Sequence, residues 1–324
     1  MLVDKFNRSF PYLRLSITEV CNFSCDYCLP DGYQKTGNEN FLGQDEINRL
    51  VNAFVGLGVW KIRLTGGEPT IRKDFTQIAK MIADKPEIET MAFTTNGYRL
   101  KERAQEWFDA GLNAINISID SLNAKKFHQI TGHNRMQEVR DGIDKALEVG
   151  FKKVKINVVL LKGVNDDELD SYLEYVRDTP VSVRYIELMQ TGDNLTYFNK
   201  FHLSSDHVKD QLLDRGWVEN IRNVGDGPAV NFTHSDFQGS IGLIAPYSKD
   251  FCTGCNRLRI TSSGDLRLCL FGNVGIPLRH MLQSDEQKDD LMAAIRKQLE
   301  YKASSHFLND GDTGIMTNLS STGG

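Results

Sequence analysis

The 324-residue sequence lacks long hydrophobic runs and has few cysteines, histidines and prolines. No stretch of 18 consecutive apolar residues occurs, and one of the longest apolar runs, residues 156–161, has only the length of a strand. This pattern excludes a transmembrane helix. The first 17 residues contain no apolar segment of the kind found in secretory signals. We therefore expect a soluble cytoplasmic protein with no membrane partner.

An excess of positive charge is also absent. The chain has 38 Lys and Arg against 43 Asp and Glu, which gives a formal net charge of −5. A protein with this balance does not attract nucleic acids or anionic membranes over its whole surface, so no nucleic-acid partner is expected. Any anionic ligand must be bound by a local cluster of Arg and Lys side chains.

The six cysteines form two groups of three: Cys21, Cys25 and Cys28, and Cys252, Cys255 and Cys269. In a reducing compartment, clustered cysteines favour metal binding over disulfides. Structural zinc usually has four protein ligands in two pairs, so one zinc ion would leave surplus cysteines. A four-iron cluster held by three thiolates leaves one iron open for an exogenous ligand. Iron–sulfur binding is the favoured interpretation, with disulfides, zinc and unligated core cysteines as alternatives.

Strand-like and helix-like segments alternate along the first two thirds of the chain. Expected strands are residues 12–17, 61–65, 91–95, 114–119, 154–160 and 182–188, and expected helices are residues 45–58, 72–84, 102–111, 137–150 and 166–178. Successive β-α units predict parallel strands joined by right-handed crossovers. The pattern does not separate an open sheet from a barrel. Polar segments follow nearly every strand, which predicts one active face at the carboxyl ends of the strands.

The pattern changes after about residue 220. Residues 222–250 are rich in glycine and contain short strand-like pieces, and a helix follows the second group of cysteines. Ser284 and Gln287 have the spacing of a capping box at the start of this helix. We therefore expect one domain over residues 1–222 and a smaller C-terminal unit over residues 223–324.

The order of the motifs resembles a known family. The C-x3-C-x2-C motif after the first strand, followed by Gly66-Gly67-Glu68-Pro69 after the second, resembles the radical S-adenosylmethionine superfamily. The second triad, in F-C-T-G-C-N-R-L-R, and the terminal Gly323-Gly324 resemble the molybdenum cofactor biosynthesis protein A family, the GTP 3′,8-cyclases. The resemblance runs across essentially the whole chain. It implies an α/β fold, an incomplete (β/α)6 TIM-type barrel closed by a smaller C-terminal α+β region.

The resemblance also implies the chemistry. The family members are lyases that use two [4Fe–4S] clusters and S-adenosylmethionine to convert GTP to (8S)-3′,8-cyclo-7,8-dihydroguanosine 5′-triphosphate. An external one-electron reductant supplies electrons, and the product passes to cyclic pyranopterin monophosphate synthase. A homodimer is a further expectation. Alternatives are a twin-cluster radical enzyme acting on a peptide or another small molecule, and a non-enzymatic electron carrier or zinc protein.

The family's functional residues map onto this sequence position by position. Cys21, Cys25 and Cys28 are expected to hold the first cluster, and Cys252, Cys255 and Cys269 the second. Expected contacts to S-adenosylmethionine are Tyr27, Gly67, Ser118 and Met189. Expected contacts to GTP are Arg14, Arg63, Thr94, Lys155, Arg257, Leu258 and Arg259, of which Arg257 and Arg259 are expected to act in catalysis with the first triad. The Gly323-Gly324 tail is expected to reach the active site.

Overall fold

A computed structural model describes residues 1–35, 37, 39–221, 226–315 and 320 of the chain. The six expected strands are present and lie side by side in chain order, all parallel. They are β1 (Tyr12–Ser16), β2 (Lys61–Thr65), β3 (Thr90–Thr95), β4 (Ala114–Ser118), β5 (Lys153–Leu160) and β6 (Ser182–Glu187). The five expected helices are α1 (Gln44–Gly56), α2 (Phe75–Ala83), α3 (Leu100–Asp109), α5 (Met136–Glu148) and α6 (Leu169–Asp178).

Three further helices were not expected: α4 (Ala124–Thr131), α7 (Leu195–Phe201) and α8 (Asp206–Asp214). The sequence does signal α4. The Asn123 side chain accepts hydrogen bonds from the backbone N–H groups of Lys125 and Lys126, and Gly132 ends the helix with a φ of 75°. With only eight residues, α4 is too short for its hydrophobic periodicity to stand out.

The C-terminal region completes the same sheet at both of its edges. β9 (Ser240–Ile244) pairs parallel with β6, and β10 (Arg257–Ile260) pairs parallel with β1. Short antiparallel strands follow at each edge: β8 (Val230–Thr233) and β7 (Val218–Glu219) beyond β9, and β11 (Asp265–Arg267) and β12 (Ile276–Pro277) beyond β10.

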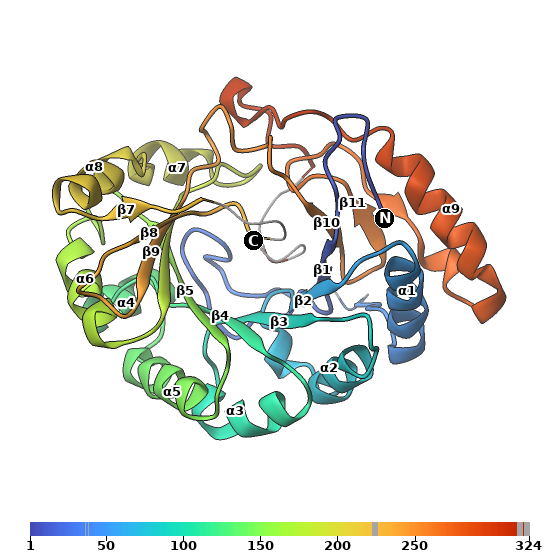
Figure 1. The fold of residues 1–324 in the computed structure, drawn as a ribbon, viewed down its shortest axis with the longest axis horizontal. Helices are drawn as coiled ribbons and strands as arrows, with labels where there is room; N and C mark the ends of the chain where they lie inside the picture. Colours follow the sequence, from blue (N-terminus) through green and yellow to red (C-terminus); the bar gives the residue numbers. More distant parts are fainter. Residues whose placement is uncertain (36, 38, 222–225, 316–319, 321–324) are drawn as a thin grey trace.

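The eight parallel strands run in the order β10-β1-β2-β3-β4-β5-β6-β9. They curve around a central space and carry the helices on their outer side (Figure 1). The expected incomplete barrel is therefore confirmed. Because the sheet is continuous across residue 222, the division into two units at that residue remains a prediction.

The remaining elements lie mainly in the C-terminal region. They are η1 (Pro69–Ile71), η2 (Arg279–Met281), η3 (Asp285–Gln287), α9 (Lys288–Leu299) and η4 (Leu308–Asp310). The expected capping box is present, since the Ser284 N–H donates to the Gln287 side chain at 3.1 Å. It opens η3, which leads directly into α9, and α9 packs beside α1 (Figure 1).

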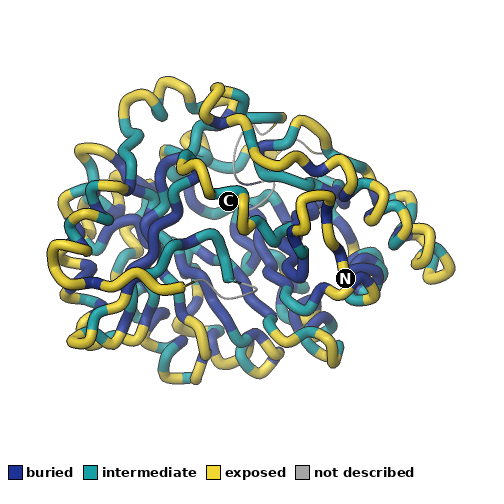
Figure 2. The backbone as a smooth tube through the Cα atoms, turned by 45° about the horizontal axis from the view of Figure 1, so that its top comes forward, coloured by how far each residue is buried: buried dark blue, intermediate teal, exposed yellow. Residues whose placement is uncertain are grey.

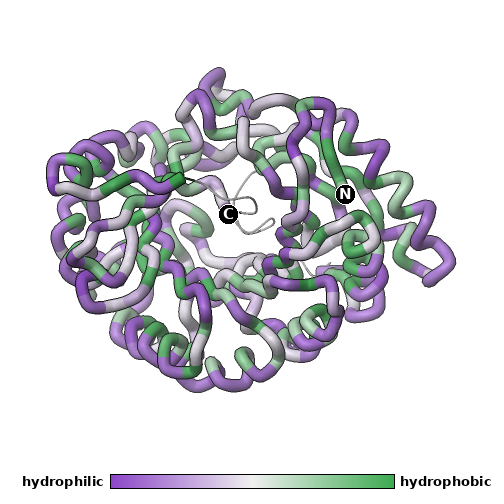
Figure 3. The backbone as a smooth tube through the Cα atoms, viewed as in Figure 1, coloured by the Kyte–Doolittle hydropathy of each residue, from purple (hydrophilic) through white to green (hydrophobic). Residues whose placement is uncertain are grey.

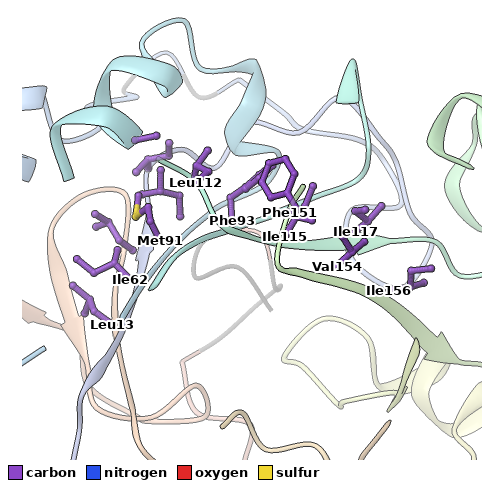
Figure 4. Close-up of a cluster of buried hydrophobic side chains, with 14 of the residues drawn as sticks. Leu13, Ile62, Met91, Phe93, Leu112, Ile115, Ile117, Phe151, Val154 and Ile156 are labelled. Carbon is purple, nitrogen blue, oxygen red and sulfur yellow. The ribbon is translucent and has the colours of Figure 1, made fainter. Parts of the chain in front are cut away.

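Alternation along the strands separates a hydrophobic outer face from a polar inner face. Leu13, Ile62, Ile115 and Val154 belong to the buried core, and Figure 4 shows their side chains on the side of the strands that faces the helices. The buried residues form an inner ring of strands, while exposed residues lie mostly on the periphery (Figure 2). Hydrophilic and hydrophobic residues alternate around this ring (Figure 3).

Within the described part of the chain, no helix has both the length and the apolar character needed to span a bilayer.

Candidate active site

The first cysteine triad lies in the loop between β1 and α1. The N–H groups of Cys28 and Leu29 both donate to the Cys25 carbonyl oxygen at 2.9 Å, which forms a tight turn. The end of α4 supports this loop, because the Ser24 N–H donates to the Thr131 carbonyl oxygen at 3.3 Å. The side chains of Cys21, Cys25 and Cys28 all line one large cavity inside the barrel.

The Gly-Gly-Glu-Pro motif packs directly against the backbone of the cysteine loop. Gly66 has a φ of 149°, and a Cβ added there would lie 2.1 Å from the Thr18 carbonyl oxygen. A Cβ on Gly67 would lie 2.4 Å from the Val20 carbonyl oxygen. The two glycines are therefore required by the close approach of the protein's own backbone. Gly67 also lines the cavity, where its backbone is accessible to a ligand.

Glu68 connects this motif to the end of β3. Its fully buried carboxylate accepts hydrogen bonds from Thr70 N at 3.1 Å, Thr95 Oγ1 at 2.9 Å and Asn96 N at 2.6 Å. The Asn96 side chain in turn donates to Asn22 Oδ1 at 2.9 Å, in the cysteine loop. One carboxylate thus fixes the loops after β1, β2 and β3 relative to one another.

Tyr27 is positioned by Asp120, which follows β4. The Tyr27 hydroxyl donates to Asp120 Oδ2 at 2.9 Å, and the Val159 N–H donates to Asp120 Oδ1 at 2.8 Å. Burial raises the pKa of Asp120 to about 6, although these two hydrogen bonds lower it. Ser118, at the end of β4, and Met189, after β6, line the same cavity.

The second cysteine triad lies at the opposite end of the barrel. Cys252 and Cys255 precede the first residue of β10, and Cys269 follows β11, which runs antiparallel to β10. Because Arg257 is opposite Tyr12, the first residue of β1, this end corresponds to the amino ends of the parallel strands. The expectation of one active face at the carboxyl ends therefore holds for the first triad but is wrong for the second.

The three thiols of each triad fit an iron–sulfur cluster with one iron left open. In the part of the chain that the structure describes, no three Cys, His, Asp or Glu side chains are grouped as a single metal ion requires. Each triad offers three thiols to a centre that usually takes four. Burial raises the pKa of Cys21 to about 12 and that of Cys25 well above its usual range. These thiols therefore ionise only when a metal centre binds.

The second triad has a different electrostatic environment. Burial raises the pKa of Cys252, but the neighbouring His306 and Ser305 lower it to about 7. Burial also raises the pKa of Cys255, and the cations Lys302 and Arg257 more than offset this effect. The thiols of Cys252 and Cys255 are therefore easier to ionise than those of Cys21 and Cys25.

Seven cationic side chains line the cavity from adjacent strands: Arg14, Lys61, Arg63, Lys155, Arg184, Arg257 and Arg259. Arg259, Arg14 and Arg63 lie opposite one another on β10, β1 and β2. The described cavity lining includes only two acidic residues, Asp120 and Glu187, both at the carboxyl ends of strands. The cavity thus has a strongly positive middle and a mildly acidic end near the first triad.

Burial and mutual repulsion shift the pKa values of these cations downward. Burial, together with Arg184 and Arg63, lowers the pKa of Lys155 to about 6. Burial, followed by Arg63, lowers the pKa of Arg184 to about 10. Arg184 Nε has no hydrogen-bond partner among the described residues. An anionic ligand between these side chains would offset their mutual repulsion and favour their charged forms.

Burial would raise the pKa of Tyr12, but Arg63 and Arg14 lower it to about 7. Arg63 donates to the Tyr12 hydroxyl at 2.5 Å and to Thr94 Oγ1 at 3.3 Å. Thr94 thereby joins the same polar row as the cations. The cavity lining therefore provides hydroxyl groups beside the positive charges.

All the expected site residues except Leu258 line this one cavity. The Leu258 side chain points into the hydrophobic core, since it alternates with Arg257 and Arg259 along β10. Its expected contact with GTP remains a prediction. The Gly323-Gly324 tail lies outside the described residues, although Ser320, just before it, lines the cavity.

Several cavity residues were missed at the level of sequence. Lys61 and Arg184 are the clearest examples, and Asn116, Asn157 and His306 also line the cavity. The signal for the first two was present, because each is a basic residue within a strand that also carries buried apolar residues. Lys61 also lies two positions before Arg63 on β2 and so shares its face.

Comparison with known proteins agrees with this geometry. The profile of the Radical SAM superfamily matches residues 15–176, and that of Molybdenum Cofactor Synthesis C matches residues 181–308. GTP 3′,8-cyclase from Aeromonas hydrophila is 55% identical over 100% of this chain and 96% of its own length. The protein of the same name from Stenotrophomonas maltophilia is 55% identical over 100% of this chain and 99% of its own length.

Among solved structures, Streptococcus suis SuiB bound to S-adenosylmethionine is similar in fold, with a TM-score of 0.60 and 15% sequence identity. The match covers 89% of this chain and 68% of SuiB. At this identity the likeness supports the fold alone. The two sequence profiles meet between residues 176 and 181, ahead of the boundary expected at residue 222.

Proposed function

Because this chain belongs to the GTP 3′,8-cyclase family of radical S-adenosylmethionine enzymes, we propose that it converts GTP to (8S)-3′,8-cyclo-7,8-dihydroguanosine 5′-triphosphate in molybdenum cofactor synthesis. One observation carries the proposal beyond the family resemblance. Seven buried or partly buried cations line the cavity between two open cysteine triads. This arrangement suits a highly charged anion held between two metal centres.

The first triad and the loops around it suit S-adenosylmethionine. When bound, the cluster and S-adenosylmethionine supply a 5′-deoxyadenosyl radical able to remove the ribose 3′ hydrogen of GTP. The chain itself positions the ligand through the backbone of Gly67 and through Tyr27, which Asp120 holds in place. The acidic groups at this end, Asp120 and Glu187, favour a ligand that carries a sulfonium and an ammonium group.

The cationic middle of the cavity suits the triphosphate of GTP. Arginine side chains make bidentate contacts with phosphate oxygens, and Arg14, Arg63 and Arg259 lie in one row across three adjacent strands. Lys155 reaches the same space from β5. Holding GTP in this way fixes the distance from its ribose to the first triad and from its guanine to the second, whose open iron is proposed to meet the base.

The external reductant follows from the one-electron chemistry of the family. Passage of the product to cyclic pyranopterin monophosphate synthase, a homodimer and a cytoplasmic location are further parts of this proposal. They are supported by the family resemblance.

The decisive experiment is anaerobic incubation of the reconstituted protein with S-adenosylmethionine, GTP and a reductant, followed by mass spectrometry. We expect 5′-deoxyadenosine and a cyclised GTP to form together, and neither to accumulate above background without GTP. If 5′-deoxyadenosine formation does not depend on GTP but does depend on an added peptide, the result would support the alternative of a peptide-modifying enzyme. Zinc without acid-labile sulfide in anaerobically purified protein would contradict radical chemistry altogether.

A further inference from the structure

A buried arginine near the amino terminus holds together segments that are distant in the sequence. Arg8 lies in a small hairpin closed by the bridge between Val3 and Ser9, and it pairs with the buried carboxylate of Asp4 at 2.7 Å. Its guanidinium also donates to the carbonyl oxygens of Cys252 at 3.1 Å, Ser304 at 2.7 Å and Ala303 at 2.6 Å. Arg8 therefore fixes the backbone of a cysteine of the second triad.

Lys302 holds the backbone next to Cys269, the third cysteine of the second triad. Its Nζ donates to the carbonyl oxygen of Leu268, the residue before Cys269, and lies 5.3 Å from the centroid of the Phe10 ring. Lys302 is only 3% exposed. Among the described residues it makes no ion pair with a carboxylate. A buried ammonium group without a counter-ion is costly, so an anionic group is expected beside it.

Arg8 and Lys302 differ in whether a carboxylate balances their charge. The charge of Arg8 is balanced by Asp4, while that of Lys302 is not balanced by any described carboxylate. The Lys302 ammonium group also lies beside the backbone that leads into Cys269. Arg8 thus serves mainly to hold the loops, and Lys302 adds a positive charge next to the triad.

We propose that Arg8 and Lys302 form a cationic clamp that positions the loops bearing Cys252 and Cys269, and that Lys302 supplies the positive charge that sets the reduction potential of the second cluster. This inference rests on the proposed function, since it requires a cluster at the second triad. Neither residue lines the cavity, so both are positioning residues. A nearby positive charge favours the reduced, more negative state of a cluster, and therefore raises its potential.

The test uses the full chain with Cys21, Cys25 and Cys28 all replaced by Ala, so that bound iron reports the second cluster alone. In this background, Lys302→Met should shift the midpoint potential of the cluster to a more negative value. Lys302→Arg keeps the positive charge, so it should leave the midpoint potential unchanged. Arg8→Lys keeps the charge but loses the fork that joins three carbonyl groups. We expect it to lower the iron content at least twofold with little change in potential.

Arg279→Met is the matched control. Arg279 pairs with Glu46 at 2.7 Å and donates to the Asn40 carbonyl oxygen at 2.6 Å, so it also tethers the C-terminal region to the N-terminal half. It does not line the cavity. A loss of thermal stability without a change in iron content or potential is expected for this variant.

The outcomes separate the clamp from the proposed function. If the triple-alanine background binds no iron, the second cluster and the clamp both fail. If that background binds iron normally, and Lys302→Met and Arg8→Lys match it in iron content and potential, only the clamp is overturned. Should Lys302→Met not fold, a normal iron content in Arg8→Lys overturns the clamp by itself.

Discussion

Lys155 offers a quantitative test of triphosphate binding in the barrel. Burial and the neighbouring Arg184 and Arg63 lower its pKa to about 6 in the free protein. A bound triphosphate would restore an ordinary lysine pKa near 10. At pH 8 the free amine is therefore almost wholly neutral and the bound amine charged, so GTP binding should take up about one proton at this residue.

The affinity should change with pH in a defined direction. Because the protonated amine binds the triphosphate, GTP affinity is highest when Lys155 is already charged, near or below pH 6, and weakens as the pH rises above this value. The second ionisation of a phosphate group lies near pH 6, so GTP itself contributes little above pH 8. Lys61, whose pKa burial and Arg63 lower to about 8, adds a smaller uptake in the same range.

Lys155→Met removes both the charge and the proton uptake. Loss of one charge-assisted hydrogen bond costs about 1.5–3 kcal/mol, which corresponds to roughly 10- to 150-fold weaker GTP binding. Isothermal titration calorimetry at pH 8, in buffers of different ionisation enthalpy, measures affinity and proton uptake together. The difference in uptake between the wild type and the variant isolates Lys155 from Lys61.

Lys152, three positions before Lys155, provides a matched control, since its side chain is exposed and does not line the cavity. Lys152→Met should leave the affinity and the proton uptake unchanged. GTP binding to Lys155→Met could instead take up as many protons as binding to the wild type, or be equally tight. Either result would show that Lys155 does not contact the triphosphate, and our assignment of the cationic middle of the cavity to the triphosphate would be wrong.

Three other changes test the two ends of the site. Cys252→Ala should retain about half of the iron and lose the GTP-dependent product, and an unchanged iron content would contradict cluster binding at the second triad. Gly66→Ala places a Cβ against the Thr18 carbonyl oxygen, so we expect poor loading of the first cluster and a thermal midpoint lowered by several degrees; normal values of both would show that the backbone can relax there. Glu68→Gln replaces an acceptor of several hydrogen bonds with an amide, which should cost about 1–3 kcal/mol in the free energy of unfolding by urea and weaken S-adenosylmethionine binding. An unchanged urea midpoint would refute this role of Glu68.

The six central strands and five of the helices could be predicted from the sequence because their hydrophobic period is clear. α8 has as many residues as α2 but buries only Val208 and Leu212, so its hydrophobic period is weaker. The places of the edge strands in the sheet could not. β9 is as long as β1, but β9 and β10 pair with β6 and β1, which are not their neighbours in the chain. Local periodicity carries no information about such pairing, so the barrel was expected from the family resemblance, and the addition of a C-terminal strand to each edge of the sheet only became clear in the structure.

The candidate site, too, could be predicted only in part from the sequence. Spacing alone revealed both cysteine triads, and the basic residues on apolar strands pointed to an anion. The sequence did not reveal that Cys255 lies at the amino end of β10, opposite the first triad, because that placement depends on the pairing of β10 with β1. Arg8 and Lys302 were missed for a related reason. Their partners are backbone carbonyl oxygens, which leave no trace in the identity of the contacting residues.

The open seam between β9 and β10 has a consequence for the size of the ligand that the barrel accepts. A closed barrel of eight strands has an interior just wide enough to be filled by its own side chains. Here the eight parallel strands end at β9 on one side and β10 on the other, and the described strands of the two edges are not hydrogen-bonded to each other. Because the ladder is not closed in this way, the side chains do not fill the whole interior, which leaves the cavity that both cysteine triads and the seven cationic side chains line.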